Sequence, residues 1–164
     1  MRLVAVLAVI FFSGLASASE CYPVFNEKDF ISAIGKKPEN MQVFNDGGTL
    51  RHQYSFRKES IGEEAFNDES KGDDEPQFYI TVYDPPCPER ITIHFYANED
   101  KSMNKINVAL AAKAFEYLVG TSSTIFFNKI DKLKGVQRFD SYDEKADSVF
   151  AKIGDSYSIQ IHIK

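Results

Sequence analysis

The chain has three histidines, the side chains best suited to acid–base chemistry or metal binding near neutral pH. In the expected strand, His52 lies on the same face as Leu50 and Tyr54. We therefore expect a hydrogen-bonded core residue at this position, with catalysis as the alternative. His94 and His162 each lie on the polar side of an alternating run. If these runs are neighbouring strands, the two imidazoles share one face and, with a carboxylate, form a candidate metal site. Solvent-facing histidines are the alternative.

Established catalytic motifs are absent from the sequence. It contains no Gly-x-Ser-x-Gly, no His-Glu-x-x-His and no glycine-rich phosphate loop. An EF-hand register with Gly72 at the sixth position places Lys71 and Phe78 where oxygen ligands are required. We therefore predict no catalytic residue, no metal and no cofactor. A small metal-dependent hydrolase using His94 and His162 is the remaining enzymatic alternative.

Cys21 and Cys87 are the two cysteines of the chain. Cys87 lies in the stretch DPPCP, where three prolines fix the backbone φ angles around it. An isolated pair in an oxidising compartment typically forms a disulfide. This one closes a loop of 67 residues, which contributes about 4 kcal/mol by chain entropy. We predict a Cys21–Cys87 disulfide that attaches the N-terminus to a turn, with a catalytic or redox thiol as the alternative.

The first 18 residues have the organisation of a secretory signal peptide. Arg2 precedes an apolar run over 3–12, and Ala16 and Ala18 provide the small residues of a cleavage site. The run is shorter than the roughly 20 apolar residues that span a bilayer. We expect cleavage after Ala18, leaving residues 19–164 as one exported domain without stable membrane insertion. The expected compartment is a bacterial periplasm, with secretion as the alternative.

Acidic residues are concentrated in one segment. Residues 59–75 hold eight acids and one lysine, a net charge of −7. Without Arg2 the exported chain carries −6, so the remainder is near +1 and offers no basic footprint for nucleic acid. We expect a mobile acidic loop over 59–76, because so few apolar residues cannot offset its ordering entropy. The predicted contacts to a basic partner are Glu63, Glu64, Phe66, Asp68, Asp73 and Asp74, with a purely solvated loop as the alternative.

Hydrophobic periodicity predicts an α+β fold, an antiparallel sheet of hairpins packed by one main helix. Helices are expected at 26–35 and about 102–119, and hairpins at 41–57, 77–97 and 147–164. Residues 122–134 fit a helix, with a strand as the alternative, and 144–153 fit either, with the strand preferred. The expected inward residues of the strands are Phe78, Ile80, Val82, Ile91, Ile93, Phe95, Ile159, Ile161 and Ile163. Those of the main helix are Met103, Ile106, Leu110, Ala114, Tyr117 and Leu118.

These features together favour a binding protein over an enzyme. A small exported domain with one disulfide and no catalytic motif fits an immunity or inhibitor-type protein that neutralises a toxin or a cationic enzyme. Electrostatic steering by the acidic segment would accelerate encounter with such a basic partner. The alternative is an accessory subunit or a small-ligand-binding domain.

Overall fold

The computed structural model describes residues 25–56, 78–96, 101–143 and 146–164. The predicted signal peptide, Cys21 and the acidic segment with its six predicted contact residues lie outside these ranges: Glu63, Glu64, Phe66, Asp68, Asp73 and Asp74. No helix in the described ranges is long and apolar enough to span a bilayer.

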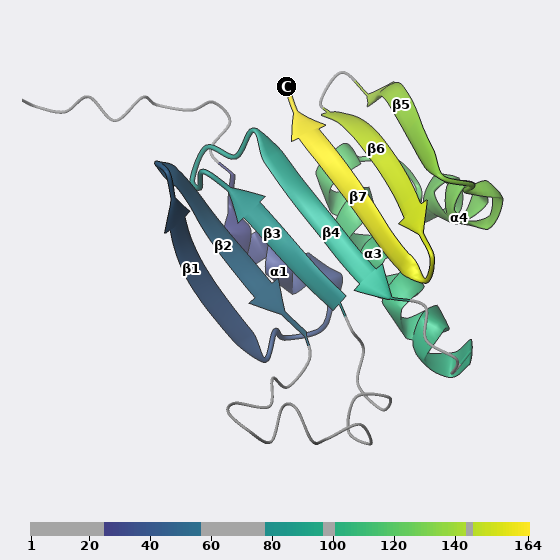
Figure 1. Cartoon of the computed structure of the whole chain (residues 1–164), viewed down its shortest axis with the longest axis horizontal. Helices are drawn as coiled ribbons and strands as arrows, with labels where there is room; N and C mark the ends of the chain where they lie inside the picture. The colour runs from purple at the N-terminus through teal and green to yellow at the C-terminus, as the bar shows by residue number, and fades with distance from the viewer. Residues whose placement is uncertain (1–24, 57–77, 97–100, 144–145) are drawn as a thin grey trace, which may run out of the picture.

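Three helices and seven strands form the described part of the chain, and they confirm the predicted α+β class (Figure 1). Their order is α1 (Glu27–Ile34), β1 (Asn40–Asp46), β2 (Thr49–Ser55), β3 (Phe78–Tyr83), β4 (Arg90–Tyr96), α3 (Lys101–Val119), α4 (Ser123–Lys132), β5 (Val136–Asp143), β6 (Ala146–Ile153) and β7 (Ser156–Ile163). The strands form one antiparallel sheet in the order β1-β2-β3-β4-β7-β6-β5. Residues 146–153 are therefore a strand, as preferred from the sequence.

Local capping explains where the two short helices begin and end. The Asn26 side chain accepts a hydrogen bond from the Asp29 amide, and Gly35 ends α1 with a left-handed φ of 77°. The Ser122 hydroxyl accepts from the Thr124 amide and caps α4 in the same way. The sequence predicted the first helix, and the structure identifies 123–132 as the second.

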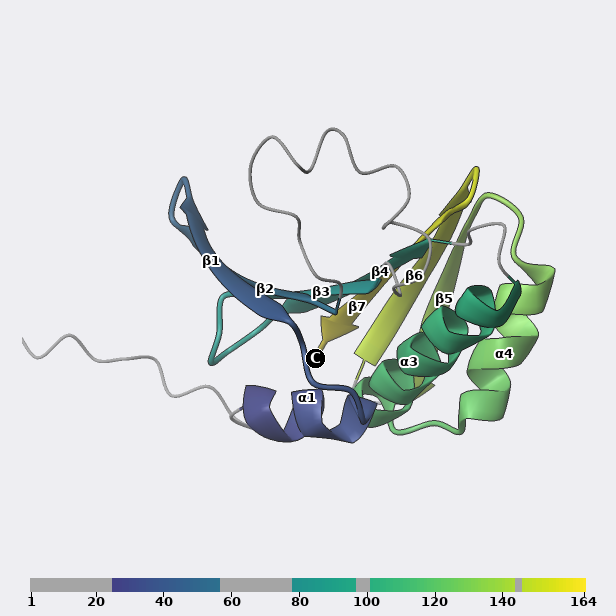
Figure 2. The ribbon, with the colours of Figure 1, turned by 90° about the horizontal axis from the view of Figure 1, so that it is seen from below.

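All three helices lie on one side of the sheet, with α3 between α1 and α4 (Figure 2). The core fills the space between them and contains the expected inward residues of β3 and β4, each at most 1% exposed. Ile159 and Ile161 of β7 are also buried, and Ile163 packs against the core from its edge. Strand alternation alone therefore assigned the covered face of the sheet correctly.

The predicted stripe of α3 is wrong at two positions. Ile106 and Tyr117 are 44% and 41% exposed, whereas Asn107, Ala111 and Phe115 are fully buried. Because α1 and α4 flank α3, the buried surface of this helix is wider than one stripe and includes a polar residue. The Asn107 side-chain amide donates a hydrogen bond to the Tyr96 carbonyl oxygen at 2.7 Å, which links α3 to the end of β4.

The edge strand β5 was not expected from the sequence. Its residues, VQRFDSYD, alternate poorly, and its pairing with β6 shifts register between Phe139 and Asp143. A strand paired on one side and interrupted by such a shift depends on its neighbour more than on its own pattern. Periodicity therefore gave too little signal at this edge.

Candidate functional site

One face of the sheet packs on the helices, and no described helix covers the opposite face (Figure 2). The outer strands bend away from the helices, so the uncovered face is concave. Strand register places alternate residues of β2, β3 and β4 on it. We call this surface the open face. The side chains at its centre, on β2, β3 and β4, include Arg51, Gln53, Tyr79, Thr81, Tyr83, Arg90, Thr92, His94 and Tyr96.

Two arginines of the open face are held by aromatic rings. The Arg90 guanidinium lies 3.8 Å from the ring centre of Tyr83, its cross-strand partner. The Arg51 guanidinium lies 5.3 Å from the ring centre of Phe44 and forms an ion pair with Asp46. Such stacking fixes a guanidinium while its N–H edge remains able to donate hydrogen bonds.

A hollow of about 530 Å³ lies on this face, over β2, β3 and β4. Its lining includes one small hydroxyl residue, Thr81, which is 7% exposed; the cross-strand neighbour Thr92 is 3% exposed. Longer polar and aromatic side chains surround them. The hollow is lined by Arg51, Gln53, Tyr79, Thr81, Tyr83, His94 and Tyr96.

His94 is the titratable histidine of this hollow. Burial lowers its pKa below the ordinary value of a histidine, because desolvation disfavours the charged imidazolium. The imidazole is therefore neutral at neutral pH, where it offers one hydrogen-bond donor and one acceptor. His94 is suited to hydrogen bonding with a bound partner.

The alternative of a metal site at His94 and His162 does not fit the observed spacing of the two histidines. β4 and β7 are neighbours, as required, but His94 is opposite Ser158 and His162 is opposite Arg90. The two histidines share a face yet lie four residues apart along the strands, on the order of 13 Å. Within the described ranges, no group of three or more histidine, cysteine or acidic residues could hold a metal ion.

His52 is hydrogen-bonded, as expected, and lies on the helix side of β2. Its Nδ1 atom is 2.9 Å from a Glu27 carboxylate oxygen, and the Tyr54 hydroxyl donates to the same carboxylate at 3.0 Å. Burial, and next the negative charge of Glu27, raise the pKa of Tyr54. Glu27 begins α1, so this cluster attaches the helix to the sheet near its edge.

Cys87 is half-buried in the connection between β3 and β4. The described residues contain no free cysteine. The Phe25 amide donates to the Pro86 carbonyl oxygen at 3.3 Å, so the chain entering α1 runs beside this connection. Cys21 lies outside the described ranges, and the disulfide stays a prediction.

The sequence search did not single out the open face as a site, because it looked for catalytic and metal motifs. The signal was present in the strands themselves. The alternation that assigns Phe78, Ile80 and Val82 to the core assigns Tyr79 and Tyr83 to the other side. A strand side rich in tyrosine and arginine was the available indication of a binding surface.

Comparisons of the chain with protein-family models, with curated proteins and with solved structures return no match. We therefore infer its function from the residues of this chain.

Proposed function

We propose that the chain is an exported protein-binding protein of the immunity or inhibitor type, which neutralises a toxin or a cationic enzyme by binding it on the open face. The observation that carries this proposal is the composition of that face. Three tyrosines and two arginines lie together there, and the open-face side chains of β2, β3 and β4 include no lysine, aspartate or glutamate; the neighbouring acid is Asp46 of β1, which pairs with Arg51. Enrichment in tyrosine and arginine with depletion of lysine and acids is the signature of protein-interface cores.

The breadth of the open face favours a macromolecule over a small ligand. Small-molecule sites bury most of the surface of their ligand in a deep cleft. Here the side chains spread over three strands of a concave sheet and surround a hollow. No described helix or strand covers this hollow. Tyrosine and arginine anchors on such a surface suit the protruding loop of a partner protein.

The acidic segment supports a basic partner. The Phe56 amide donates to the Phe78 carbonyl oxygen at 3.0 Å, so the described residues on either side of 57–77 meet at one end of β2 and β3. Tyr79 of the open face follows directly. The net charge of −7 over 59–75, joined to this border through Arg57 and Lys58, would steer a cationic partner toward the open face. An accessory subunit or a small-ligand-binding domain is the alternative function.

Site-specific photo-crosslinking tests the proposal. A benzophenone amino acid would replace Tyr79 or Tyr83 on the open face, and Tyr117 on the exposed side of α3 would serve as the matched control. Each variant of the exported chain would be incubated with the exported-protein fraction of the source organism. We expect one basic protein to be crosslinked from Tyr79 and Tyr83 and not from Tyr117. Equal labelling at all three positions, or none, would contradict the proposal.

The acidic segment is tested separately on the captured partner. Neutralising Glu63, Glu64, Asp68, Asp73 and Asp74 to amides should slow association by about tenfold at low salt and flatten its salt dependence. Dissociation should change less, because peripheral charges act mainly on the encounter rate. Unchanged association kinetics would mean that the segment is solvated and does not steer the partner.

A further inference from the structure

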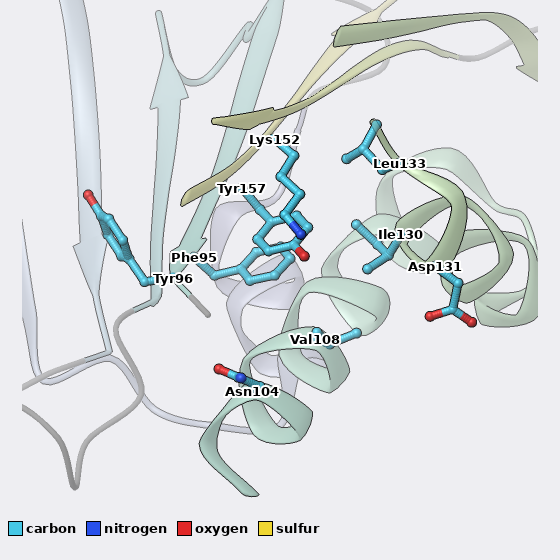
Figure 3. Close-up of a pocket in the computed structure, with 9 residues that line it drawn as sticks. All are labelled: Phe95, Tyr96, Asn104, Val108, Ile130, Asp131, Leu133, Lys152 and Tyr157. Atoms are coloured by element: carbon cyan, nitrogen blue, oxygen red, sulfur yellow. The ribbon is translucent and has the colours of Figure 1, made fainter. Parts of the chain in front are cut away.

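A second hollow lies on the helix side of the sheet, at the ends of β4 and β7 beside α3 and α4 (Figure 3). Its volume of about 350 Å³ is within the range of small-molecule sites. Because the open face is on the other side of the sheet, we call this hollow the helix-side pocket.

The inner wall of the helix-side pocket is apolar. The rings of Phe95 and Tyr157 stack on each other, with their centres 4.8 Å apart and their planes 3° apart, and this aromatic pair forms part of the wall. Val108 of α3 and the buried Ile130 and Leu133 at the end of α4 complete the wall. This lining suits a hydrocarbon chain or ring and not a polar group.

A single ammonium group overhangs this apolar wall. Lys152 and Tyr157 are cross-strand partners, and the Lys152 Nζ atom lies 5.0 Å from the centre of the Tyr157 ring. The pKa of Lys152 is raised first by the neighbouring Tyr157 hydroxyl and, more weakly, by the negative charge of Asp155. In Figure 3 its side chain reaches over the pocket, whereas the Asp131 carboxylate is directed away. Within the described ranges, no carboxylate lies within ion-pair distance of Lys152.

We propose that the helix-side pocket binds a small organic carboxylate with an apolar tail. The tail would lie on the stacked rings of Phe95 and Tyr157, between Val108 and Leu133. The carboxylate would remain near the pocket mouth and accept hydrogen bonds from the Lys152 ammonium group. An ion pair at the mouth and an apolar tail inside complement the two halves of the pocket. This site uses none of the open-face side chains except Tyr96, which borders both hollows.

Titration with octanoate tests the proposal on the exported chain. NMR spectra of the methyl groups would report binding at Val108, Ile130 and Leu133, and 1-octanol would serve as the uncharged ligand of equal length. We expect octanoate to shift these methyl signals and to bind more tightly than 1-octanol. Absence of methyl shifts, or equal affinity for the two ligands, would overturn the proposal.

Two matched variants isolate the role of the ammonium group. Lys152→Met keeps the length of the side chain and should weaken octanoate binding by about tenfold, with little effect on 1-octanol. Lys105→Met removes the same charge from an exposed position on α3 and should leave both affinities unchanged. Equal weakening of octanoate by the two variants would overturn the proposed ion pair.

A third variant separates the pocket from the open face. Tyr83→Ser alters the open face and should bind octanoate like the unmodified chain. Loss of octanoate binding in a folded Tyr83→Ser protein would place the ligand elsewhere and overturn the proposal.

Discussion

The two faces of one sheet differ in what holds their side chains in place. On the helix side, the alternate residues of β3 and β4 are isoleucine, valine and phenylalanine, and they are excluded from water. On the open face, the intervening residues are tyrosine, arginine, histidine and threonine, and among them the Arg90 guanidinium stacks on the cross-strand Tyr83 ring. The residue types of the first set are explained by the stability that their burial gives to the fold. The second set buries less apolar surface, and this difference is the basis of our proposal that the open face binds a partner.

Removing an aromatic residue from the helix side should have the largest effect. Phe150 is fully buried and packs against Phe115 and Phe126, with ring centres 5.6 and 5.8 Å away. Phe150→Ala should lower the free energy of unfolding by about 3–5 kcal/mol, since it leaves a cavity among rings that cannot collapse fully. Chemical denaturation measures the change. A loss below 1 kcal/mol would mean that this cluster is not the core.

Replacing a buried lysine on the helix side should change the free energy of unfolding by a smaller amount and should raise it. Lys129 of α4 is 8% exposed and lies 5.5 Å from the ring centre of Phe150. Burial lowers the pKa of Lys129 to about 8, because the charged form loses its hydration. Below pH 8 the folded chain therefore carries the desolvation cost of the charged Lys129. Lys129→Met should raise the free energy of unfolding at pH 7 by about 2–3 kcal/mol.

The difference in stability between Lys129→Met and the unmodified chain should depend on pH, and this dependence tests the lowered pKa of Lys129 more sharply. Between pH 8 and about 10.5 the unfolded chain binds the Lys129 proton and the folded chain does not, so the stability contributed at this position rises with pH. The advantage of Lys129→Met should therefore shrink through this interval. An advantage that is constant from pH 7 to pH 10 would contradict the lowered pKa.

Removing the carboxylate from the Glu27–His52–Tyr54 cluster should lower the free energy of unfolding by an intermediate amount. Glu27→Ala leaves the His52 imidazole and the Tyr54 hydroxyl without their carboxylate partner, and it should cost about 1–2 kcal/mol in thermal or chemical unfolding. Glu116→Ala, at an exposed position of α3, is the control and should change stability by less than about 0.5 kcal/mol. Equal effects of the two substitutions would show that the cluster does not fasten the helix.

Substitution on the open face should have the smallest effect on stability. Tyr83→Ser removes the ring beneath Arg90 on a surface that no described helix covers. We expect a loss within about 1 kcal/mol by chemical denaturation, since an exposed cation–π pair contributes about 0.5–1 kcal/mol. A loss as large as that of Phe150→Ala would remove the contrast between the two faces.

The sequence predicted the fold well where one periodicity dominates. The alternating runs at Phe78–Val82 and Ile91–Phe95 and the capped helix after Asn26 were confirmed. It failed at α3, where two flanking helices bury Asn107 and Phe115 and leave Ile106 exposed, because helical spacing does not say how many neighbours a helix has. It also failed at β5, whose pattern is weak and whose pairing is irregular.

For the candidate sites, too, the sequence predicted some features correctly and missed others. The sequence placed His94 on the polar side of its strand and expected His52 to be hydrogen-bonded in the core. It could not give the register between β4 and β7, which separates His94 from His162 by four residues. The pattern of hairpins flanking one helix did predict helices on one face of the sheet, as the structure shows for the described helices, but it did not identify the tyrosines and arginines of the uncovered face as a candidate site.

The central claim is that the open face binds the partner, and its affinity for the crosslinked protein tests this most directly. Dissociation constants would be measured for the unmodified chain, for Tyr79→Ser/Tyr83→Ser and for the helix-side control Tyr117→Ser, each shown to be folded. We expect the double variant to bind at least about 100-fold more weakly, since interface tyrosines in such positions contribute 2 kcal/mol or more each. The control should bind like the unmodified chain. Unchanged affinity in the double variant, or equal loss in the control, would contradict the assignment of the open face as the binding surface.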